Sequence, residues 1–459
     1  MSTFGTLGTG LAGLGAARAG IDIAANNLAN VDTTGYTRQR ITTTSAAPLA
    51  GTTSTAPVSG GVAVTGISRL ADAQADSLVR SSSADAAFTG VRAEAYADIE
   101  AILGEPGELG LQAGLADFWA AWQDLSNDPS DAGRVSLLLS AAGSLASTIR
   151  SGHAAVSAAR DTAAARTSIA VDEANSVASR IANLNASIQA ATASGGNTAE
   201  LMDQRDVALE QLSALTGATV RVAPDGTTTA SIGGVPIVEG TTTRQLAVAS
   251  LADGTPQVEW AHRPGAAVEL GSGELAGLRS VLDPASGAFA QTLAAYDAVA
   301  TAVATQTNTI HASGSTTAGT TGLDFFATGP GSPAATLTVV PTGPAGVATG
   351  AVGAGAYDAS VADAISLVGG STGGPDTLWR SAVVAVGSQS ATATSAADTA
   401  VAIQDRAKAS QLGGAAVSVD EENVALMAYQ RSYQAAARVI TAVDEALDVL
   451  INRTGLVGR

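Results

Sequence analysis

Both ends of the chain carry a seven-residue repeat of apolar side chains. Within each repeat the apolar residues recur at alternating spacings of three and four, which is the pattern of a coiled-coil contact face. One interpretation is two core helices of an ordinary bundle, but the terminal position of both seams favours helices that pair with each other and then with other subunits. The first seam contains Leu7, Leu11, Leu14, Ile21 and Leu28, and the second contains Leu426, Tyr429, Tyr433, Ile440, Val443, Leu447 and Leu450.

The N-terminal repeat is rich in glycine, at Gly8, Gly10, Gly13, Gly15 and Gly20. Each glycine in a helix interior costs about 0.8–1 kcal/mol relative to alanine. We therefore expect this helix to be unstable in isolation and to need close partners, because glycine lets another backbone approach closely.

Between the two seams, alanine-rich helical runs alternate with segments that lack a helical period. After Gly217, Val, Thr and Gly dominate, which predicts five or six short strands. A further strand is expected at Thr336–Val340, and Gly413-Gly414 is expected to separate the last two helices. The sequence predicts a mainly α fold with a small β insert, in which both termini form a long coiled-coil-like rod and the β domain projects outward.

The expected organisation has four parts. They are a terminal helical layer (1–45 and 413–459), a helical rod body (46–216, 273–314 and 377–412), a β-rich insert (217–272) and a Gly/Thr-rich segment of loops and strands (315–376).

Composition excludes several classes of function. The chain has 23 Lys and Arg against 41 Asp and Glu, a formal charge of −18, which argues against nucleic-acid binding because that requires a basic surface. It has no cysteine, which excludes disulfides and thiol nucleophiles, and only 3 histidines. No basic residue precedes Arg18 and no long apolar run occurs, so we expect neither a cleaved secretory signal nor membrane insertion.

Two short matches to catalytic or cofactor motifs lack the context those motifs need. Gly8-x-Gly10-x-x-Gly13 matches a dinucleotide fingerprint, but no strand can precede it. Gly369-x-Ser371-x-Gly373 matches a nucleophile elbow, but it lies in a loop-forming segment. The sequence therefore predicts no catalytic residue, no metal ligand and no cofactor, and we expect the chain not to be an enzyme.

Residues 26–39 carry a recognisable string, Asn-Asn-Leu-Ala-Asn-Val-Asp-Thr-Thr-Gly-Tyr-Thr-Arg-Gln. It resembles the signature of the bacterial flagellar rod, hook and hook-associated proteins, and Gly-Tyr-Thr-Arg-Gln at 35–39 is similar to the hook-associated members. Residues 114–131, Leu-Met-Asp-Gln-Arg-Asp at 201–206 and the C-terminal stretch 418–440 resemble further stretches of that family in the same order. The residues that carry the signature are Asn26, Asn27, Asn30, Gly35, Tyr36, Arg38 and Gln39.

The resemblance implies an extracellular structural protein that polymerises in a helical ring at the distal end of the hook and joins it to the filament. Implied partners are further copies of the chain, the hook protein, a second junction protein on the filament side, and an export chaperone on the C-terminal helix. Export would proceed without a cleaved signal peptide. Two alternatives remain, namely another flagellar axial protein (hook, distal rod or second junction protein), and a secreted enzyme or adhesin acting through 217–272.

Overall fold

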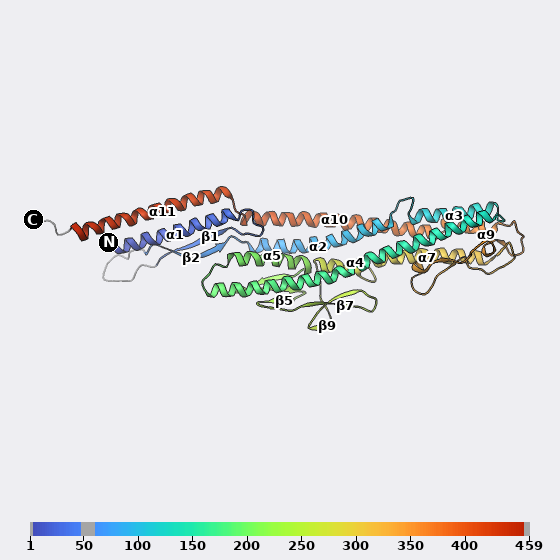
Figure 1. Cartoon of the computed structure of the whole chain (residues 1–459), viewed down its shortest axis with the longest axis horizontal. Coiled ribbons are helices and arrows are strands. Elements are labelled where there is room, and N and C mark those ends of the chain that lie inside the picture. The colour runs from blue at the N-terminus through green and yellow to red at the C-terminus, as the bar shows by residue number, and fades with distance from the viewer. Residues whose placement is uncertain (1–2, 47–59, 454–459) are drawn as a thin grey trace, which may run out of the picture.

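The computed structural model describes residues 3–46 and 60–453, which form a long rod (Figure 1). At one end of the rod, helix α1 (Thr3–Ala29) lies against helix α11 (Val419–Asp448). Both described chain ends lie at this end of the rod, and a π-helical turn, η3 (Val449–Arg453), continues α11. The two predicted terminal helices are therefore present and paired within one chain.

A two-stranded hairpin connects the terminal pair to the rest of the rod. Strand β1 (Gln39–Ser45) pairs antiparallel with β2 (Val62–Arg69), with Ile41 opposite Ile67 and a register shift after Thr42. Both strands also contact α1, so the hairpin packs beside the terminal pair.

The middle of the rod is a bundle of long helices. Helix α10 lies along α2, and α4 lies along α3, α5 and α7 (Figure 1). Asp72 caps the start of α2 by accepting hydrogen bonds from Gln74 N and Ala75 N. The bundle helices are α2 (Ala73–Leu103), α3 (Leu111–Asn127), α4 (Ala132–Ala193), α5 (Ala199–Thr216), α6 (Glu274–Leu282), α7 (Ala288–Ala312) and α10 (Pro375–Ala415).

Helix α10 passes through Gly413-Gly414, so the predicted break at these glycines is wrong. Neither glycine has the positive φ of a helix-ending residue, and the Ala416 N–H still donates to Leu412 O at 2.8 Å. The chain turns one step later, and Ser418 then opens α11 by accepting a hydrogen bond from Glu421 N. A glycine in a helix interior costs about 1 kcal/mol relative to alanine, which weakens a long helix without ending it.

The β insert projects from the side of the rod beside α4 (Figure 1). It contains seven strands rather than five or six, since the two-residue strand β6 is too short to leave a sequence period. They form a four-stranded sheet of β3 (Thr219–Val222), β4 (Thr228–Ile232), β5 (Val235–Glu239) and β6 (Thr242–Thr243), and a three-stranded sheet of β7 (Leu246–Ser250), β8 (Pro256–Trp260) and β9 (Arg263–Ala267).

Residues 314–370 form loops and short elements at the other end of the rod (Figure 1). The strand expected at Thr336–Val340 is only Thr338–Val339, because Ser332 and Pro333 start a helical turn that still includes Thr336. The short elements are β10 (Gly314–Thr316), β11 (Phe326–Ala327), α8 (Pro333–Thr336), β12 (Thr338–Val339), η1 (Pro344–Gly346), β13 (Ala348–Ala351), α9 (Ser360–Ser366) and η2 (Val368–Gly370).

The core is thickest at this distal end. Phe118, Trp122, Phe325 and Phe326 are all at least 99 % buried, and the Trp122 and Phe325 ring centroids lie 5.1 Å apart. Along the rest of the rod the buried side chains include many alanines, such as Ala142. The few aromatic residues therefore anchor one end of the rod, and small residues hold the long helices close together.

Helix α4 has one 18-residue window with a mean hydropathy of at least 1.2, which is enough by length and composition to cross a membrane. A third of that window is buried inside the structure, and the helix packs along α3, α5 and α7. We interpret α4 as the central core helix of the bundle.

His311 is a buried neutral imidazole that joins α7 to the distal loops. Its Nδ1 lies 2.7 Å from Leu323 O, a pure acceptor, so Nδ1 carries the proton. Its Nε2 accepts from Ala348 N at 2.8 Å. Burial lowers the pKa of His311 below its ordinary value, because the charged form is poorly solvated.

We expect acidification to destabilise the fold through His311. The unfolded histidine titrates near 6.5, and the folded one titrates lower, so this contribution is complete above about pH 6.5 and declines by up to about 1.4 kcal/mol per pH unit below it. Urea unfolding at pH 7.0 and 5.5 should give a smaller pH difference for His311→Gln than for the wild type. His262→Gln is the control, since His262 is exposed. Equal pH differences in all three proteins would contradict this role.

Candidate assembly site

The terminal pair is held by close approach of α1 to α11. A Cβ atom added at Gly20 would lie 2.5 Å from the Tyr429 ring, and one at Gly10 would lie 3.1 Å from Ile440 Cγ1. At Gly13 it would lie 3.6 Å from Ala436 Cβ. These pairs run in opposite directions along the two helices, so the helices are antiparallel. Because a Cβ at Gly20 would overlap the ring, only glycine fits there.

The seam predicted on α11 faces this glycine stripe over most of its length. Val443 is 8 % exposed, and Leu426, Tyr429, Ile440 and Leu447 are partly buried. Two further members of the seam, Tyr433 and Leu450, are 38 % and 54 % exposed.

The stripe of α1 that faces α11 most directly is not the predicted leucine seam. Leu11 is 65 % exposed, and Leu7, Leu14, Ile21 and Leu28 are partly buried. The stripe that meets α11 is displaced by one residue around the helix, and it contains Gly10, Gly13, Ala17, Gly20, Ala24 and Asn27. The leucine seam and the glycine stripe have the same spacing. The glycine stripe faces α11 because its small residues leave room for the large side chains of α11.

Asn27 is the hub of a buried polar joint at the base of the terminal pair. It is 1 % exposed, and its Nδ2 donates to Gln39 O at 2.9 Å and to Glu422 Oε2 at 3.0 Å. Its Oδ1 accepts from Gln39 N at 3.0 Å and from the Tyr36 hydroxyl at 2.8 Å. One amide therefore ties α1, β1 and α11 together.

Arg38 adds charge to the same joint. Its Nε lies 2.6 Å from Glu422 Oε1 and its NH1 lies 2.5 Å from Glu421 Oε2. Its backbone N–H donates to Ala415 O at 2.9 Å, at the end of α10. Burial, followed by the charges of Asp203 and Glu422, raises the pKa of Tyr36 to about 12, so its hydroxyl stays protonated as a donor.

The remaining signature residues shape the turn between α1 and β1. Asn30 Nδ2 donates to Asn26 O at 3.0 Å and to Asn26 Oδ1 at 2.6 Å. Gly35 has a φ of +80°, and a Cβ there would lie 2.5 Å from Val207 Cγ2, so this position requires glycine on two grounds. The structure thus brings all seven signature residues to the turn and joint that connect the terminal pair to α5.

Helix α5 supplies an ionic half of the joint that sequence reasoning did not assign. Arg69 of β2 lies 2.7 Å from Asp203 Oδ1 and 2.8 Å from Asp206 Oδ2, and Thr37 N donates to Asp203 Oδ2 at 3.2 Å. Burial raises the pKa of Asp203 despite the opposing charge of Arg69. The spacing of three between the two aspartates places them on one helix face and was the available signal.

Arg205, between these aspartates in sequence, serves the opposite face of α5. Its NH1 donates to Gly226 O at 2.7 Å and to Asn185 Oδ1 at 3.2 Å. Asn185 Nδ2 donates to Thr228 O at 3.0 Å and Gly240 O at 2.7 Å. One short string, residues 203–206, therefore holds the hairpin on one side and the β insert on the other.

His153, Ser332 and Asp297 meet near the start of α8, but they do not form a catalytic triad. Ser332 Oγ lies 3.1 Å from His153 Nε2 but donates to Asp297 Oδ1 at 2.5 Å, and it also accepts from Ala335 N as the cap of α8. In a nucleophilic triad the carboxylate orients the histidine. Here the Asp297 carboxylate binds the serine instead, so the three residues do not form such a triad. Over residues 3–46 and 60–453 no cluster of three possible metal ligands is found.

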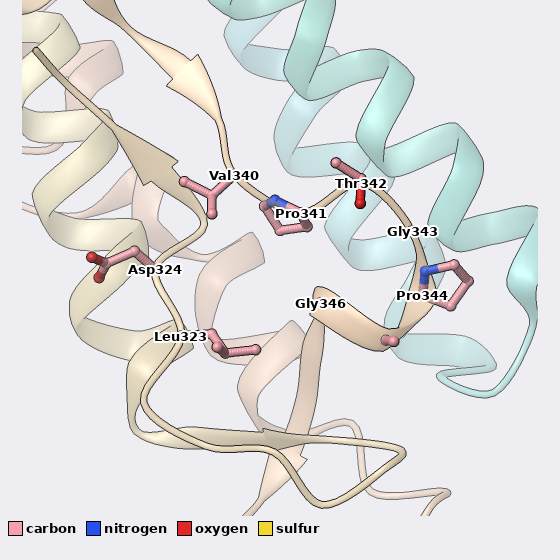
Figure 2. A pocket seen from close by; sticks show the side chains of 9 residues that line it. Leu323, Asp324, Val340, Pro341, Thr342, Gly343, Pro344 and Gly346 are labelled. Atoms are coloured by element: carbon pink, nitrogen blue, oxygen red, sulfur yellow. The ribbon is translucent and has the colours of Figure 1, made fainter.

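A recess of about 320 Å³ lies between Val340 and the turn at η1, and Figure 2 shows the side chains that line it. Proline, glycine and backbone form much of its lining, and Asp324 is its ionisable residue. The Asp324 carboxylate points away from the turn in Figure 2. This recess therefore offers no convergent set of reactive groups, and the polar joint remains the better candidate site.

We predict that Glu421 and Glu422 contribute very differently to the stability of the terminal pair, although both bind Arg38. Glu422 is 4 % exposed at its side chain and Glu421 is 63 % exposed. Glu422→Ala removes the buried acceptor of Arg38 Nε and one of the two acceptors of Asn27 Nδ2, and it should destabilise the terminal pair by about 2–4 kcal/mol. Glu421→Ala should cost less than about 1 kcal/mol. Amide exchange in α1 and α11 measures both, and equal losses of protection would contradict the joint.

Three family models match separate parts of the chain. The model "Flagellar hook-associated protein FlgK helical domain" covers residues 96–326, "Flagella basal body rod protein" covers 7–37, and "Flagellar basal body rod FlgEFG protein C-terminal" covers 409–453. The first spans half of the chain, and the other two fall on α1 with its turn and on α11 with the end of α10.

Similar proteins carry the same description. Flagellar hook-associated protein 1 of Bacillus subtilis is 26 % identical over 505 residues, covering 100 % of both chains. The protein of that name from Salmonella typhimurium is 29 % identical over 334 residues, covering 70 % of this chain and 58 % of its own. The solved flagellar hook junction protein FlgK from Burkholderia pseudomallei is 26 % identical, with a TM-score of 0.48 over 55 % of this chain and 46 % of that chain. The chain belongs to the flagellar hook-associated protein FlgK family, since the family model spans half of it.

Proposed function

We propose that this chain polymerises at the distal end of the hook and joins the hook to the filament. The observation that carries the proposal is the leucine seam of α1, which remains available after α1 has paired with α11. Leu11 is 65 % exposed, and Leu7 and Leu14 are partly buried. Pairing within the chain uses the glycine stripe and leaves the leucines for a neighbour.

Burial of the seam supplies the driving force for assembly. Fully burying an exposed leucine side chain contributes about 1.5–3 kcal/mol, so Leu11, which is 65 % exposed, offers the largest gain, and the partly buried Leu7 and Leu14 offer less. Exposed apolar residues continue onto α11, where Val424 is 63 % and Met427 is 49 % exposed. The terminal pair thus carries exposed apolar surface on both helices, which suits packing between copies in a ring.

The proposed contacts extend to neighbours on both sides. The hook protein would meet the ring from below, and a second junction protein and the filament would meet it from above. Before assembly an export chaperone would cover α11, and the chain would leave the cell without cleavage of a signal peptide. The absence of cysteine suits a chain that is exported unfolded. The role is structural, and we assign no catalytic step to the β insert.

The direct test is deletion of the gene. Cells without this chain should build hooks that carry no filaments and should release flagellin into the medium, since nothing retains it at the hook tip. Electron microscopy of isolated hooks and an immunoblot of the medium measure the two effects. Normal filaments on the hooks of the deletion strain would refute the proposed junction role.

Single charges should separate the two faces of the terminal pair. Leu11→Asp should abolish filament-bearing hooks while leaving amide protection of α1 and α11 unchanged, because Leu11 faces away from α11. Ile440→Asp should abolish filament-bearing hooks and also lower the amide protection of α1 and α11, since Ile440 contacts Gly10. Leu109→Asp is the matched control, because Leu109 is 95 % exposed in the turn between α2 and α3. Wild-type filaments with Leu11→Asp would contradict the seam's role.

A further inference from the structure

The face of α11 that points away from α1 carries a regular stripe of its own. Val424, Arg431, Arg438 and Glu445 recur every seven residues, two positions after the seam residues that meet α1. All four side chains are exposed. A seven-residue spacing keeps them on one line along the helix, so this charged stripe (424, 431, 438 and 445) is a continuous surface.

Charge is separated along this stripe. Its middle is basic, at Arg431 and Arg438, and its C-terminal part is acidic, at Glu445 with Asp444 beside it. Within residues 3–46 and 60–453, no ion pair involves either arginine. No acidic residue lies three or four positions from either arginine, so the helix itself cannot neutralise them.

Helix α1 adds to the basic part. Arg18 lies between Gly13, which faces Ala436, and Gly20, which faces Tyr429, so it stands at the level of Arg431. Arg18 is exposed and takes part in no ion pair of the described chain. The terminal pair therefore has a basic belt in its middle, made of Arg18, Arg431 and Arg438 with Asp22 as an acidic neighbour of Arg18, and an acidic zone toward the C-terminal end of α11.

We propose that this stripe is an interface between copies, in which the basic belt of one terminal pair meets the acidic zone of the next. The inference rests on the proposed polymerisation, and it adds how neighbouring copies are aligned along the helix axis. Two parallel copies at the same level would place arginine against arginine, which is repulsive. A shift along the helix by about two to four turns, roughly 10–20 Å, places arginine beside Asp444 and Glu445 instead.

The second copy is favoured over other occupants by self-complementarity. One helix carries both halves of the charge pattern, so no other partner is needed to satisfy it. An antiparallel pair would match the same charges, but it would close a two-fold dimer, whereas a ring or tube needs copies that point the same way. Complementary charges of this kind set register and exclude wrong pairings more than they add affinity. Val424, on the same stripe, adds apolar area to bury.

The test is a charge swap in the deletion strain. Arg431→Glu with Arg438→Glu should lower the fraction of filament-bearing hooks at least about tenfold, and Asp444→Arg with Glu445→Arg should do the same. The variant with all four changes restores complementarity and should recover filaments. Arg431→Lys with Arg438→Lys keeps the charge and should retain them. Electron microscopy scores the hooks, and an immunoblot of isolated hooks measures the incorporated chain.

The control reverses two arginines elsewhere. Arg221→Glu with Arg263→Glu makes the same charge change on exposed residues of the β insert and should leave filaments intact. Filaments in both double reversals, failure of the fourfold variant to recover them, or their loss in the lysine variant would each overturn the inference. These outcomes leave the junction role standing, because that role fails only if the deletion strain itself makes normal filaments.

Discussion

Close approach of two helices at glycine positions is the constraint on which the terminal end of the structure depends. Tyr429 rests where a side chain on Gly20 would otherwise stand, at 2.5 Å from the position of its Cβ. That contact fixes which face of α1 turns inward and therefore which face turns out. With the glycine stripe used inside the chain, the leucines one position further around the helix become surface. The helix penalty of glycine, about 1 kcal/mol each, is offset by contacts that a larger residue would prevent.

The polar joint transmits that arrangement to the rest of the rod. Asn27 and Glu422 lock α1 to α11, and Arg69 with Asp203 locks the hairpin to α5. These bonds join residues that are far apart in sequence. The joint is largely buried, which makes its bonds costly to break one at a time. The orientation of the terminal pair relative to the rod is therefore set by specific polar contacts rather than by apolar packing alone.

The heptads predicted both terminal helices, because a spacing of three and four is local information. They did not predict which stripe of α1 would meet α11, since the stripes containing Gly20 and Ile21 have identical periods and differ only in what the partner presents. The roles of Asp203, Arg205 and Asp206 depend on β2 and the β insert lying on opposite sides of α5, which no local pattern specifies. At Gly413 the local pattern itself was misleading, because glycine often ends a helix but here lies inside α10.

The leucine seam of α1 and the charged stripe of α11 would contribute to assembly in different ways. The leucine seam is non-directional, because apolar burial rewards any alignment that removes area from water. The charged stripe on the far side of α11 distinguishes alignments, because a displacement of one copy exchanges attraction for repulsion. A ring built on the seam alone would tolerate slippage along the helices, whereas Arg431, Arg438 and Glu445 penalise it. The leucine seam and the charged stripe thus lie on different helices, and glycine packing between those helices keeps the two surfaces in a fixed relation.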